Sequence, residues 1–331
     1  MIRSKRTPLT WSKRIRYRLE IWVLTLVIIV VQLFPRRVVQ LTASGLGWLA
    51  YYLAPLLRRI ALQNLDAAFG DSRSDLEKRR IARRSLQYFA ATIAGLFWSP
   101  RLTPENYSRY IEIDAESLAR LRGQGVIFAT MHYGDWEILG LAGGYLGFPM
   151  TIVQEKMRNP ALAKLLARLR SHSGHRLVSQ ELAVTRLFRA LRNGGSTALL
   201  IDTNTNRRGG GIWLDFFGLP VFSSVAFAAL ALRSGAPLVF AYAQPLPGGR
   251  TRLVFKQTKD FRPTGDKEHD IRELSQHCLK LCEEVIRAAP EPWMWTYKLW
   301  SPRPTEERGR YPEYSRHIRL REFKQHRQSA K

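Results

Sequence analysis

The chain has 331 residues, of which 45% are hydrophobic, and its 52 lysine and arginine residues against 27 aspartate and glutamate residues give a formal net charge of +25. This length and composition exclude a disordered chain and allow one large domain or two small ones. The charge indicates an acidic partner, which could be nucleic acid, anionic lipid or an acidic protein. Nucleic acid is the weakest of these, because the sequence has no zinc-finger spacing, aromatic RNA-binding signature or helix-turn-helix pattern.

The N-terminal region has the pattern of a membrane attachment. Its first apolar run, at 21–34, is preceded by many basic residues, and a second apolar stretch at 41–57 ends in Arg58 and Arg59. The first run is shorter than the ~20 residues of a spanning helix, and it lacks a signal-peptide cleavage site. Three interpretations stay open: a short membrane span, a helix in the membrane interface, and a buried helix of the globular domain. The basic residues before the first run are Arg3, Lys5, Arg6, Lys13, Arg14, Arg16 and Arg18.

After Arg58 the pattern is helical and amphipathic to about Tyr110, and strands then alternate with helices. Strands that alternate with helices of ten or more residues indicate an α/β fold with a mixed central sheet flanked by helices. The expected strands cover 125–131, 150–154, 197–202, 237–244 and 251–257, and the expected helices cover 160–172, 181–193, 224–235 and 271–287.

These patterns predict three regions: a basic membrane anchor at 1–60, the main domain at 61–300, and a charged basic tail at 301–331 that is solvated or faces the membrane. Glycine clusters at 193–196 and 209–211 predict turns. Cys278 and Cys282 lie four residues apart in an expected helix, where disulfide geometry is poor and two thiols cannot complete a zinc site. They are therefore interpreted as packing residues, which is typical of a reducing, cytoplasmic environment.

The stretch MHYGDWEILG at 131–140 is the main candidate for chemistry. His132 follows an expected strand, at the carboxyl end where open α/β sheets bind ligands. An acid on the following helix can fold back toward the imidazole and fix its tautomer, so that the pair acts as a general base on a bound hydroxyl. Glu137 and Asp135 compete for this role, although Asp135 is also a good N-cap for a helix that begins near it. A structural histidine in an ordinary turn is the alternative.

Other catalytic signatures are absent from the sequence. It has no G-x-S-x-G elbow, which argues against a serine hydrolase of the α/β type. It also has no H-E-x-x-H zinc pair and no G-x-x-x-x-G-K-[ST] phosphate loop, so neither a metal nor a nucleotide cofactor is expected.

The motif that runs from His132 to Glu137 resembles the H-x-x-x-x-[DE] motif of glycerolipid acyltransferases. More narrowly, it resembles the H-[FY]-G-N-W-E form of the late acyltransferases of lipid A biosynthesis. Three further blocks follow in that family's order. The stretch 159–170 is similar to the N-P…R segment, with Asn159 and Arg170 at the matching places. The stretch 202–224, which begins at Asp202, and the stretch 290–300 are similar to the last two blocks.

The sequence departs from the family's pattern at a few positions. Asp135 stands where the family often has asparagine, which suits a capping role and favours Glu137 as the partner of His132. Thr203 and Asn204 stand where a Q-[DE]-like pair is frequent, and Tyr297 replaces a histidine. These departures bear on the identity of the acceptor more than on the reaction.

The resemblance implies transfer of an acyl chain from an acyl-thioester, usually acyl carrier protein, to a hydroxyl of a membrane glycolipid such as a lipid A precursor. It also implies a glycerolipid-acyltransferase-like fold with a membrane-associated helix, at the bacterial inner membrane with the active site facing the cytoplasm. A surface of +25 suits an acidic carrier protein, a phosphorylated glycolipid and an anionic membrane.

The resemblance further implies a catalytic pair of His132 and Glu137. Arg170 is the candidate for a phosphate or carrier contact, because a guanidinium suits phosphate oxygens. Asn159 and Asp202 are expected on the substrate side, although Asn159 could cap the helix at Pro160 and Asp202 could hold the architecture. Two other functions stay open: an acyl-CoA-dependent acyltransferase for a mannolipid or phospholipid, and a non-catalytic basic lipid-binding protein.

Overall fold

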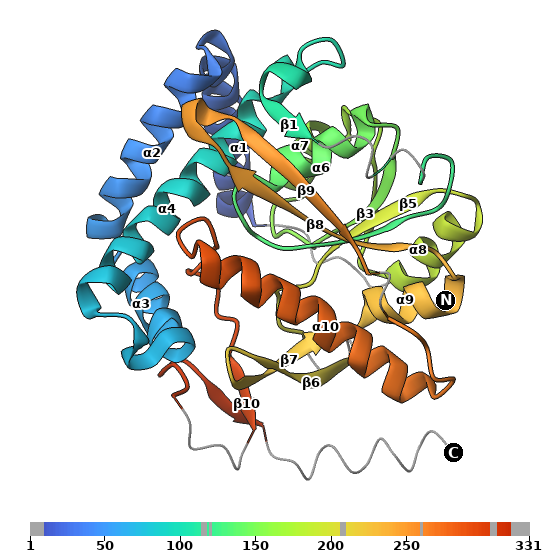
Figure 1. The fold of residues 1–331 in the computed structure, drawn as a ribbon. Coiled ribbons are helices and arrows are strands. Elements are labelled where there is room, and N and C mark those ends of the chain that lie inside the picture. Colours follow the sequence, from blue (N-terminus) through green and yellow to red (C-terminus); the bar gives the residue numbers. More distant parts are fainter. Residues whose placement is uncertain are drawn as a thin grey trace.

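A seven-stranded mixed sheet forms the centre of the computed structural model, which describes residues 10–113, 118, 121–205, 210–258, 261–304 and 310–318 (Figure 1). The strand order is β1-β9-β8-β2-β5-β3-β4, and every neighbouring pair is parallel except β8 and β9. The expected mixed sheet is therefore confirmed. Its strands are β1 (Ile111–Ile113), β2 (Ile127–Thr130), β3 (Met150–Gln154), β4 (Arg176–Ser179), β5 (Ser196–Leu200), β8 (Leu238–Pro245) and β9 (Thr251–Gln257).

Helices cover both faces of this sheet, and a separate group of helices packs at one side (Figure 1). The side group is α1 (Trp11–Leu33), α2 (Arg36–Leu53), α3 (Pro55–Phe69) and α4 (Asp75–Trp98). The helices over the sheet are α6 (Trp136–Tyr145), α7 (Pro160–Ser171), α8 (Ala183–Arg192), α9 (Ala226–Ser234) and α10 (Lys267–Ala288). The helices expected at 160–172, 181–193, 224–235 and 271–287 are thus confirmed, with α10 starting earlier because Asp266 caps it at Glu268 and His269.

The sequence patterns missed the shorter strands. β1 and β4 have three and four residues and form the two edges of the sheet, where a strand is not buried on both sides. A hairpin of β6 (Gly211–Phe216) and β7 (Leu219–Ser224) forms a separate two-stranded sheet. Its turn places Phe217 at φ 59° and Gly218 at φ 73°, the backbone of a tight hairpin turn, and Phe217 is an uncommon residue for that conformation.

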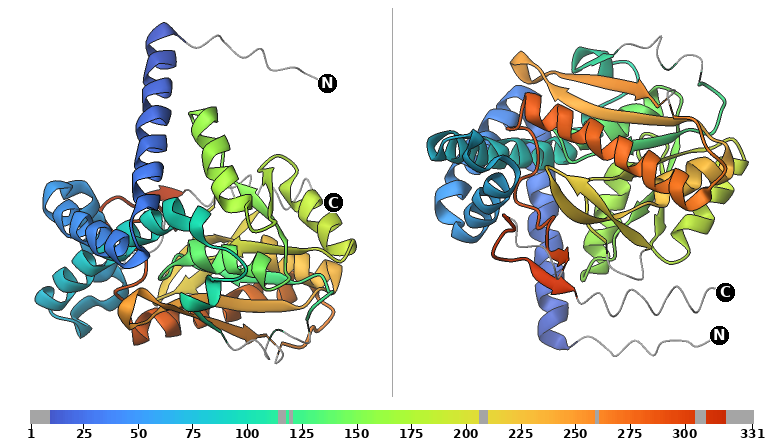
Figure 2. Two further views of the ribbon diagram at one scale, coloured as in Figure 1. Left: turned by 90° about the horizontal axis from the view of Figure 1, so that it is seen from above. Right: turned by 60° about the horizontal axis from the view of Figure 1, so that its bottom comes forward.

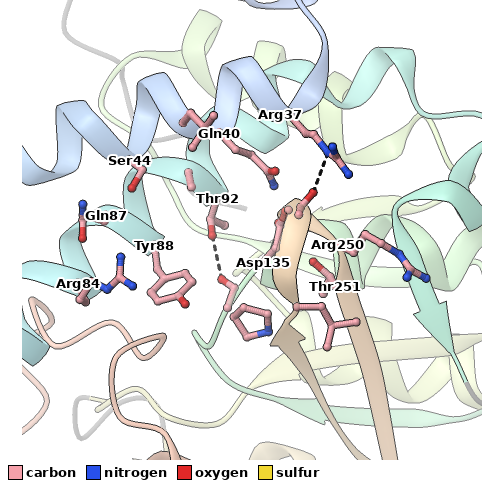
Figure 3. A pocket seen from close by; sticks show the side chains of 17 residues that line it. Arg37, Gln40, Ser44, Arg84, Gln87, Tyr88, Thr92, Asp135, Arg250 and Thr251 are labelled. Carbon is pink, nitrogen blue, oxygen red and sulfur yellow. Dashed lines mark hydrogen bonds between the residues drawn. The ribbon is translucent and has the colours of Figure 1, made fainter.

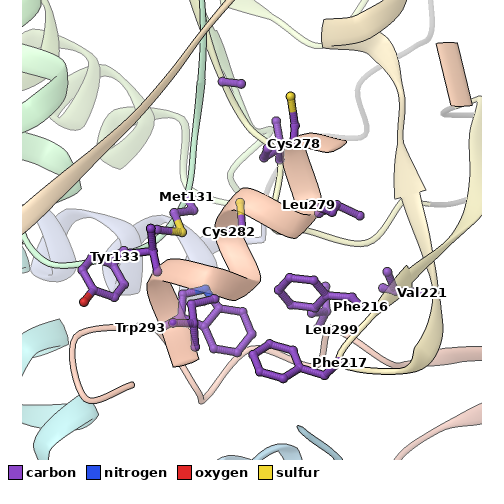
Figure 4. Close-up of a cluster of buried hydrophobic side chains, with 14 of the residues drawn as sticks. Met131, Tyr133, Phe216, Phe217, Val221, Cys278, Leu279, Cys282, Trp293 and Leu299 are labelled. Carbon is purple, nitrogen blue, oxygen red and sulfur yellow. The ribbon is translucent and has the colours of Figure 1, made fainter. Parts of the chain in front are cut away.

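Alternate residues of the central strands bury themselves on opposite faces of the sheet. Ile127 and Ala129 of β2 belong to the core under α8, α9 and α10, whereas Phe128 belongs to the core under α6. The first core contains Cys278 and Cys282 of α10 together with Met131 and Trp293, and Cys282 lies beside Met131 (Figure 4). Both cysteines are free and buried, so the interpretation as packing residues is confirmed, and burial raises the pKa of Cys278 to about 12.

Helix α1 projects from the domain next to α7 (Figure 2). Ile28 is its one buried side chain, so the interpretation as a buried helix of the domain is wrong. Within the described residues, no helix has both the length and the apolar character that crossing a membrane demands. Large apolar side chains are nevertheless exposed along α1, α2 and α3, among them Trp11, Leu19, Trp22, Leu26, Leu33, Leu41, Leu46, Trp48, Leu53 and Leu56.

The last described segment returns to the domain. Strand β10 (Pro302–Pro304) pairs with β11 (Arg316–Ile318), and the hydroxyl of Tyr311 donates to the carbonyl of Pro220 at 2.8 Å. Residues 305–309 and 319–331 of the expected tail lie outside the described residues. Arg3, Lys5 and Arg6 of the expected anchor and residues 206–209 also lie outside them.

Candidate active site

The register of two parallel strands brings His132 and Asp202 together. Strands β2 and β5 are neighbours, with Thr130 opposite Leu200, and the amide of Ile201 donates to the carbonyl of Thr130 at 2.8 Å. His132 lies two residues after Thr130, and Asp202 lies two residues after Leu200. The two side chains therefore meet at the carboxyl edge of the sheet, where His132 was expected.

The carboxylate of Asp202 accepts three hydrogen bonds. Its Oδ2 accepts from the backbone amide of His132 and from the indole Nε1 of Trp293, both at 2.8 Å, and its Oδ1 lies 3.0 Å from Nδ1 of His132. Burial by itself would raise the pKa of Asp202, but the His132 ring and the hydrogen bonds from His132 and Trp293 together hold that pKa below its ordinary value. An ionised Asp202 can only accept, so Nδ1 of His132 carries a hydrogen, and in the neutral imidazole Nε2 then has the lone pair.

The segment 290–294 holds the backbone of this turn. The amide of Gly134 donates to the carbonyl of Pro292 at 3.0 Å, and the amide of Met294 donates to the carbonyl of His132 at 3.1 Å. Gly134 has φ 58°, and a Cβ there would lie 2.0 Å from the carbonyl oxygen of Ala243, so glycine is required. The block similar to the family's C-terminal ending therefore positions His132 through its backbone as well as through Trp293.

Glu137 does not pair with His132. Its two carboxylate oxygens accept from Nε and Nη2 of Arg170 at 2.9 and 2.5 Å, a bidentate ion pair in which the Glu137 side chain is 8% exposed and that of Arg170 is 33% exposed. The expected pairing of Glu137 with the imidazole is thus corrected: Asp202 takes the position on Nδ1. Glu137 lies in the first turn of α6, and a guanidinium from α7 fills the space in front of it.

Asp135 caps α6, as predicted, because its Oδ1 accepts from the amide of Ile138 at 3.0 Å. Asp135 also forms an ion pair with Arg36. Its Oδ2 accepts from the buried Arg36 of α2 at 2.7 Å, and the side chain of Asp135 itself is 11% exposed. The interpretation of Asp135 as only a helix start is therefore incomplete, since the residue fastens α2 to the turn that carries His132.

Asn159 and Asp202 lie apart from the expected substrate side. Asn159 caps α7 by accepting from the amides of Ala161 and Leu162, and its Nδ2 donates to Glu20 at 2.9 Å and to the carbonyl of Tyr17 on α1. The capping alternative is confirmed for Asn159, and Asp202 holds the architecture around His132. Neither residue lines the cavity next to His132.

A cavity of about 540 Å³ lies in front of His132, a size typical of ligand sites. His132, Glu137 and Arg170 line its polar part. The rest of its wall is largely apolar and comes from the sheet and from α6, with Leu139, Leu146, Phe148, Met150, Ile152, Leu177 and Phe255 among the lining residues. One ligand could therefore place a polar group at His132 and a hydrocarbon chain in the interior.

Three polar residues around the site were not among the site residues expected from the sequence. Thr130 lines the cavity, and its buried hydroxyl has no hydrogen-bond partner among the described residues. Tyr297, which replaces the family's histidine, donates to Asn204 at 2.9 Å, and burial raises its pKa to about 12. His175 also lines the cavity, but its Nδ1 accepts from Met150 and its Nε2 donates to the carbonyl of Gly140, so it is a structural histidine.

In the part of the chain that the structure describes, no three His, Cys, Asp or Glu side chains gather as metal ligands. The four sequence blocks do converge on one place. The turn at 131–137 contacts each of the other three: Arg170 through Glu137, Asp202 through His132, and the segment 290–300 through the backbone of His132 and Gly134.

Comparisons with known proteins agree with the sequence resemblance. The model of a family described as bacterial lipid A biosynthesis acyltransferase matches residues 8–301. The chain is 23% identical over 265 residues to the lipid A biosynthesis palmitoleoyltransferase of Escherichia coli (strain K12) and to a lipid A biosynthesis acyltransferase of Shigella flexneri. Each alignment covers 78% of this chain and 84% of the relative. Among solved structures, the 1-acyl-sn-glycerophosphate acyltransferase PlsC of Thermotoga maritima matches with a TM-score of 0.34 and 15% identity, over 77% of this chain and 100% of that one.

Proposed function

Because the chain belongs to the bacterial lipid A biosynthesis acyltransferase family and is an acyltransferase, we propose that it moves a fatty acyl chain from an acyl-thioester to a hydroxyl of a phosphorylated membrane glycolipid. The proposed donor is acyl carrier protein, and the proposed acceptor is a lipid A precursor. The observation that carries the proposal is the His132 imidazole, fixed by a buried carboxylate, at the polar part of a largely apolar cavity. Family membership removes the alternative of a non-catalytic lipid-binding protein.

The proposed reaction is a direct transfer with His132 as general base. Nε2 of His132 takes the proton of the acceptor hydroxyl while the hydroxyl oxygen attacks the thioester carbonyl carbon. A carbon–oxygen bond forms, the carbon–sulfur bond breaks, and the proton on His132 passes to the departing thiolate. Asp202 keeps Nδ1–H in place and stabilises the imidazolium through their 3.0 Å contact.

Charge on the carbonyl oxygen in the transition state needs hydrogen-bond donors. Two are available at the cavity: the buried hydroxyl of Thr130, which has no partner among the described residues, and the guanidinium of Arg170. Arg170 uses only Nε and Nη2 for Glu137, so Nη1 can face an oxyanion or a phosphate. The proposed role of Glu137 is to hold this guanidinium in place. It replaces the expected role of orienting the His132 imidazole.

The apolar exposure of α1, α2 and α3 supports attachment to a membrane interface. A glycolipid acceptor keeps its acyl chains in the bilayer, so the enzyme must meet it there. Trp11, Trp22 and Trp48 are 78%, 75% and 45% exposed, and aromatic side chains of this kind favour the lipid–water boundary. Basic residues on α1, including Arg14 and Arg18, would contact anionic headgroups. We place this interface at the inner membrane with the cavity on the cytoplasmic side, where acyl carrier protein is found.

A donor assay tests the proposal. Purified protein with tetra-acylated disaccharide bisphosphate is given either acyl carrier protein or coenzyme A carrying the same acyl chain, and the acylated glycolipid is quantified. The proposal expects transfer from acyl carrier protein to the glycolipid. Strict dependence on coenzyme A, with a mannolipid or phospholipid as the only acceptor, would overturn both the donor and the acceptor.

A further inference from the structure

A second cavity, separate from the one in front of His132, lies between α2, α4 and the turn that joins β8 to β9 (Figure 3). Its volume is about 420 Å³, and no described residue lines both this cavity and the cavity of His132. It reaches Gly134 and Asp135, so it adjoins the turn that carries His132. The proposed acyl transfer does not use it.

The cavity carries excess positive charge. Arg37 of α2, Arg84 of α4 and Arg250 of the β8–β9 turn line it, and Figure 3 shows Arg84 across the hollow from Arg37 and Arg250. Among the residues that the structure describes, Asp135 is the one acidic residue in the lining, and its carboxylate is already paired with the buried Arg36.

The three guanidinium groups keep most of their donors free. Arg84 has no ion-pair partner among the described residues, and Arg37 donates only through Nε, to the carbonyl of Gly248 at 3.2 Å. Glu112 lies 3.7 Å from Arg250 but makes its short contact, 2.6 Å, with Arg252. Guanidinium groups with free donors around one cavity suit the oxygens of a phosphate group.

The neutral part of the wall suits a hydroxylated ligand. Oε1 of Gln40 is buried without a hydrogen-bond partner, so it can accept a hydrogen bond from a ligand hydroxyl. Ser44, Gln87 and Tyr88 add polar side chains around it (Figure 3). A phosphate that carries a small polyol group would satisfy both parts of the wall.

The cavity opens beside the apolar face of α2. Leu41 lines it and is 74% exposed, and Trp48, Leu49, Tyr52 and Leu53 continue the exposed apolar stripe along the same helix. If this stripe lies in the membrane interface, the three arginines lie at the depth of the lipid phosphates.

We propose that this cavity binds the phosphate and hydroxylated headgroup of an anionic phospholipid, such as a phosphatidylglycerol, from the surrounding membrane. The inference rests on the proposed membrane attachment and adds a lipid site that is distinct from the acceptor site at His132. A bound headgroup would bridge α2, α4 and the β8–β9 turn, the elements that surround Asp135.

The test measures binding of the purified protein to phosphatidylcholine vesicles with and without phosphatidylglycerol. The pocket variant Arg37→Gln/Arg84→Gln is compared with Arg79→Gln/Arg80→Gln, which removes the same charge from exposed positions of α4 outside the cavity. Diffuse attraction predicts equal losses, at about 1 kcal/mol for each arginine near the surface. The proposed site predicts that the pocket variant loses at least about tenfold more affinity, because charge-assisted hydrogen bonds are lost as well. Equal losses would overturn it.

A second experiment tests the lipid site independently of membrane attachment. A short-chain soluble phosphatidylglycerol, used below its micelle concentration, should raise the melting temperature of the wild type and not that of Arg37→Lys/Arg84→Lys, which keeps the charge but loses the guanidinium forks. Failure of the wild type to bind any vesicle, with this response intact, would refute the membrane attachment alone. If inorganic phosphate matches the lipid in the wild type, the site is one for free phosphate and the lipid assignment fails.

Discussion

The carboxylate of Asp202 accepts hydrogen bonds from the His132 amide, the His132 ring and the Trp293 indole. Asp202→Asn keeps its size but turns one oxygen into an amide donor. The new amide nitrogen could occupy the place of either carboxylate oxygen. At the place of Oδ2 it would face the N–H groups of His132 and Trp293, so we expect it at the place of Oδ1, next to the His132 ring. Nδ1 of His132 would then have to accept a hydrogen bond, and the ring proton would move to Nε2. The nitrogen that faces the substrate would have no lone pair left to act as a base.

Asp202→Asn should lower both the rate of acyl transfer and the stability of the fold, by different amounts. A wrong tautomer and a lost counter-charge remove general-base catalysis, which predicts a fall of about 10²–10⁴-fold in kcat, or about 3–5 kcal/mol of transition-state stabilisation. The fold loses less, because the carbonyl of the new amide still accepts from the His132 amide and from Trp293. Weakening charged hydrogen bonds to neutral ones at this buried site should cost about 1–3 kcal/mol of unfolding free energy.

The assay is steady-state acyl transfer by purified Asp202→Asn, with melting temperatures measured in parallel. Trp293→Phe is the matched control, because it removes one donor to Asp202 and leaves the contact with the His132 ring. It should lose less than about tenfold in kcat, since its effect on the base is indirect. A wild-type rate for Asp202→Asn would refute the assignment of Asp202 as the residue that positions His132. Full loss of folding would be recognised from the melting curve.

Three further predictions concern the neighbouring charges. The effects of Glu137→Gln and Arg170→Gln on kcat/KM should be strongly non-additive in a double-mutant cycle, with a coupling of about 1–3 kcal/mol, because the two side chains form one ion pair. Additive effects would contradict this pairing. Asp135→Asn should retain the helix cap but lower the free energy of unfolding by about 1–3 kcal/mol, because it leaves the buried Arg36 without its counter-charge, and an unchanged denaturation midpoint would contradict this. The pKa of Asp202 is lower in the folded protein than in the unfolded chain, where it is about 3.9. Ionised Asp202 therefore stabilises the fold fully above about pH 3.9, and this stabilisation is lost as the pH falls through the folded-state pKa. The free energy of unfolding should consequently fall more steeply with acid for the wild type than for Asp202→Asn.

The sequence was sufficient for most strands of the sheet and for the position of His132. Strands β2, β3, β5, β8 and β9 were predicted within a few residues, because buried strands that alternate with long helices leave a strong apolar pattern. His132 was placed at the carboxyl end of a strand, and the structure puts it there. The short edge strands β1 and β4 leave no comparable pattern, and they were missed.

The partner of His132 could not be found from local spacing. Glu137 was favoured because it lies one turn away in the sequence, whereas Asp202 becomes a neighbour only through the pairing of β2 with β5. A signal did exist: Asp202 ends a predicted strand just as His132 does, so adjacent strands would bring them together. Arg170 lies 33 residues from Glu137, and Arg36 lies 99 residues from Asp135, so both ion pairs depend on helix packing that spacing does not encode.

Mass spectrometry of the glycolipid product tests the central claim most directly. Wild-type protein and His132→Ala are each incubated with acyl carrier protein that bears an acyl chain and with tetra-acylated disaccharide bisphosphate. The wild type should add one ester-linked acyl chain to the glycolipid, and His132→Ala should do so about 10²–10⁴-fold more slowly while melting at the same temperature. A glycolipid of unchanged mass with the wild type, or equal rates for the two proteins, would contradict the assignment of His132 as the base of an acyl transfer.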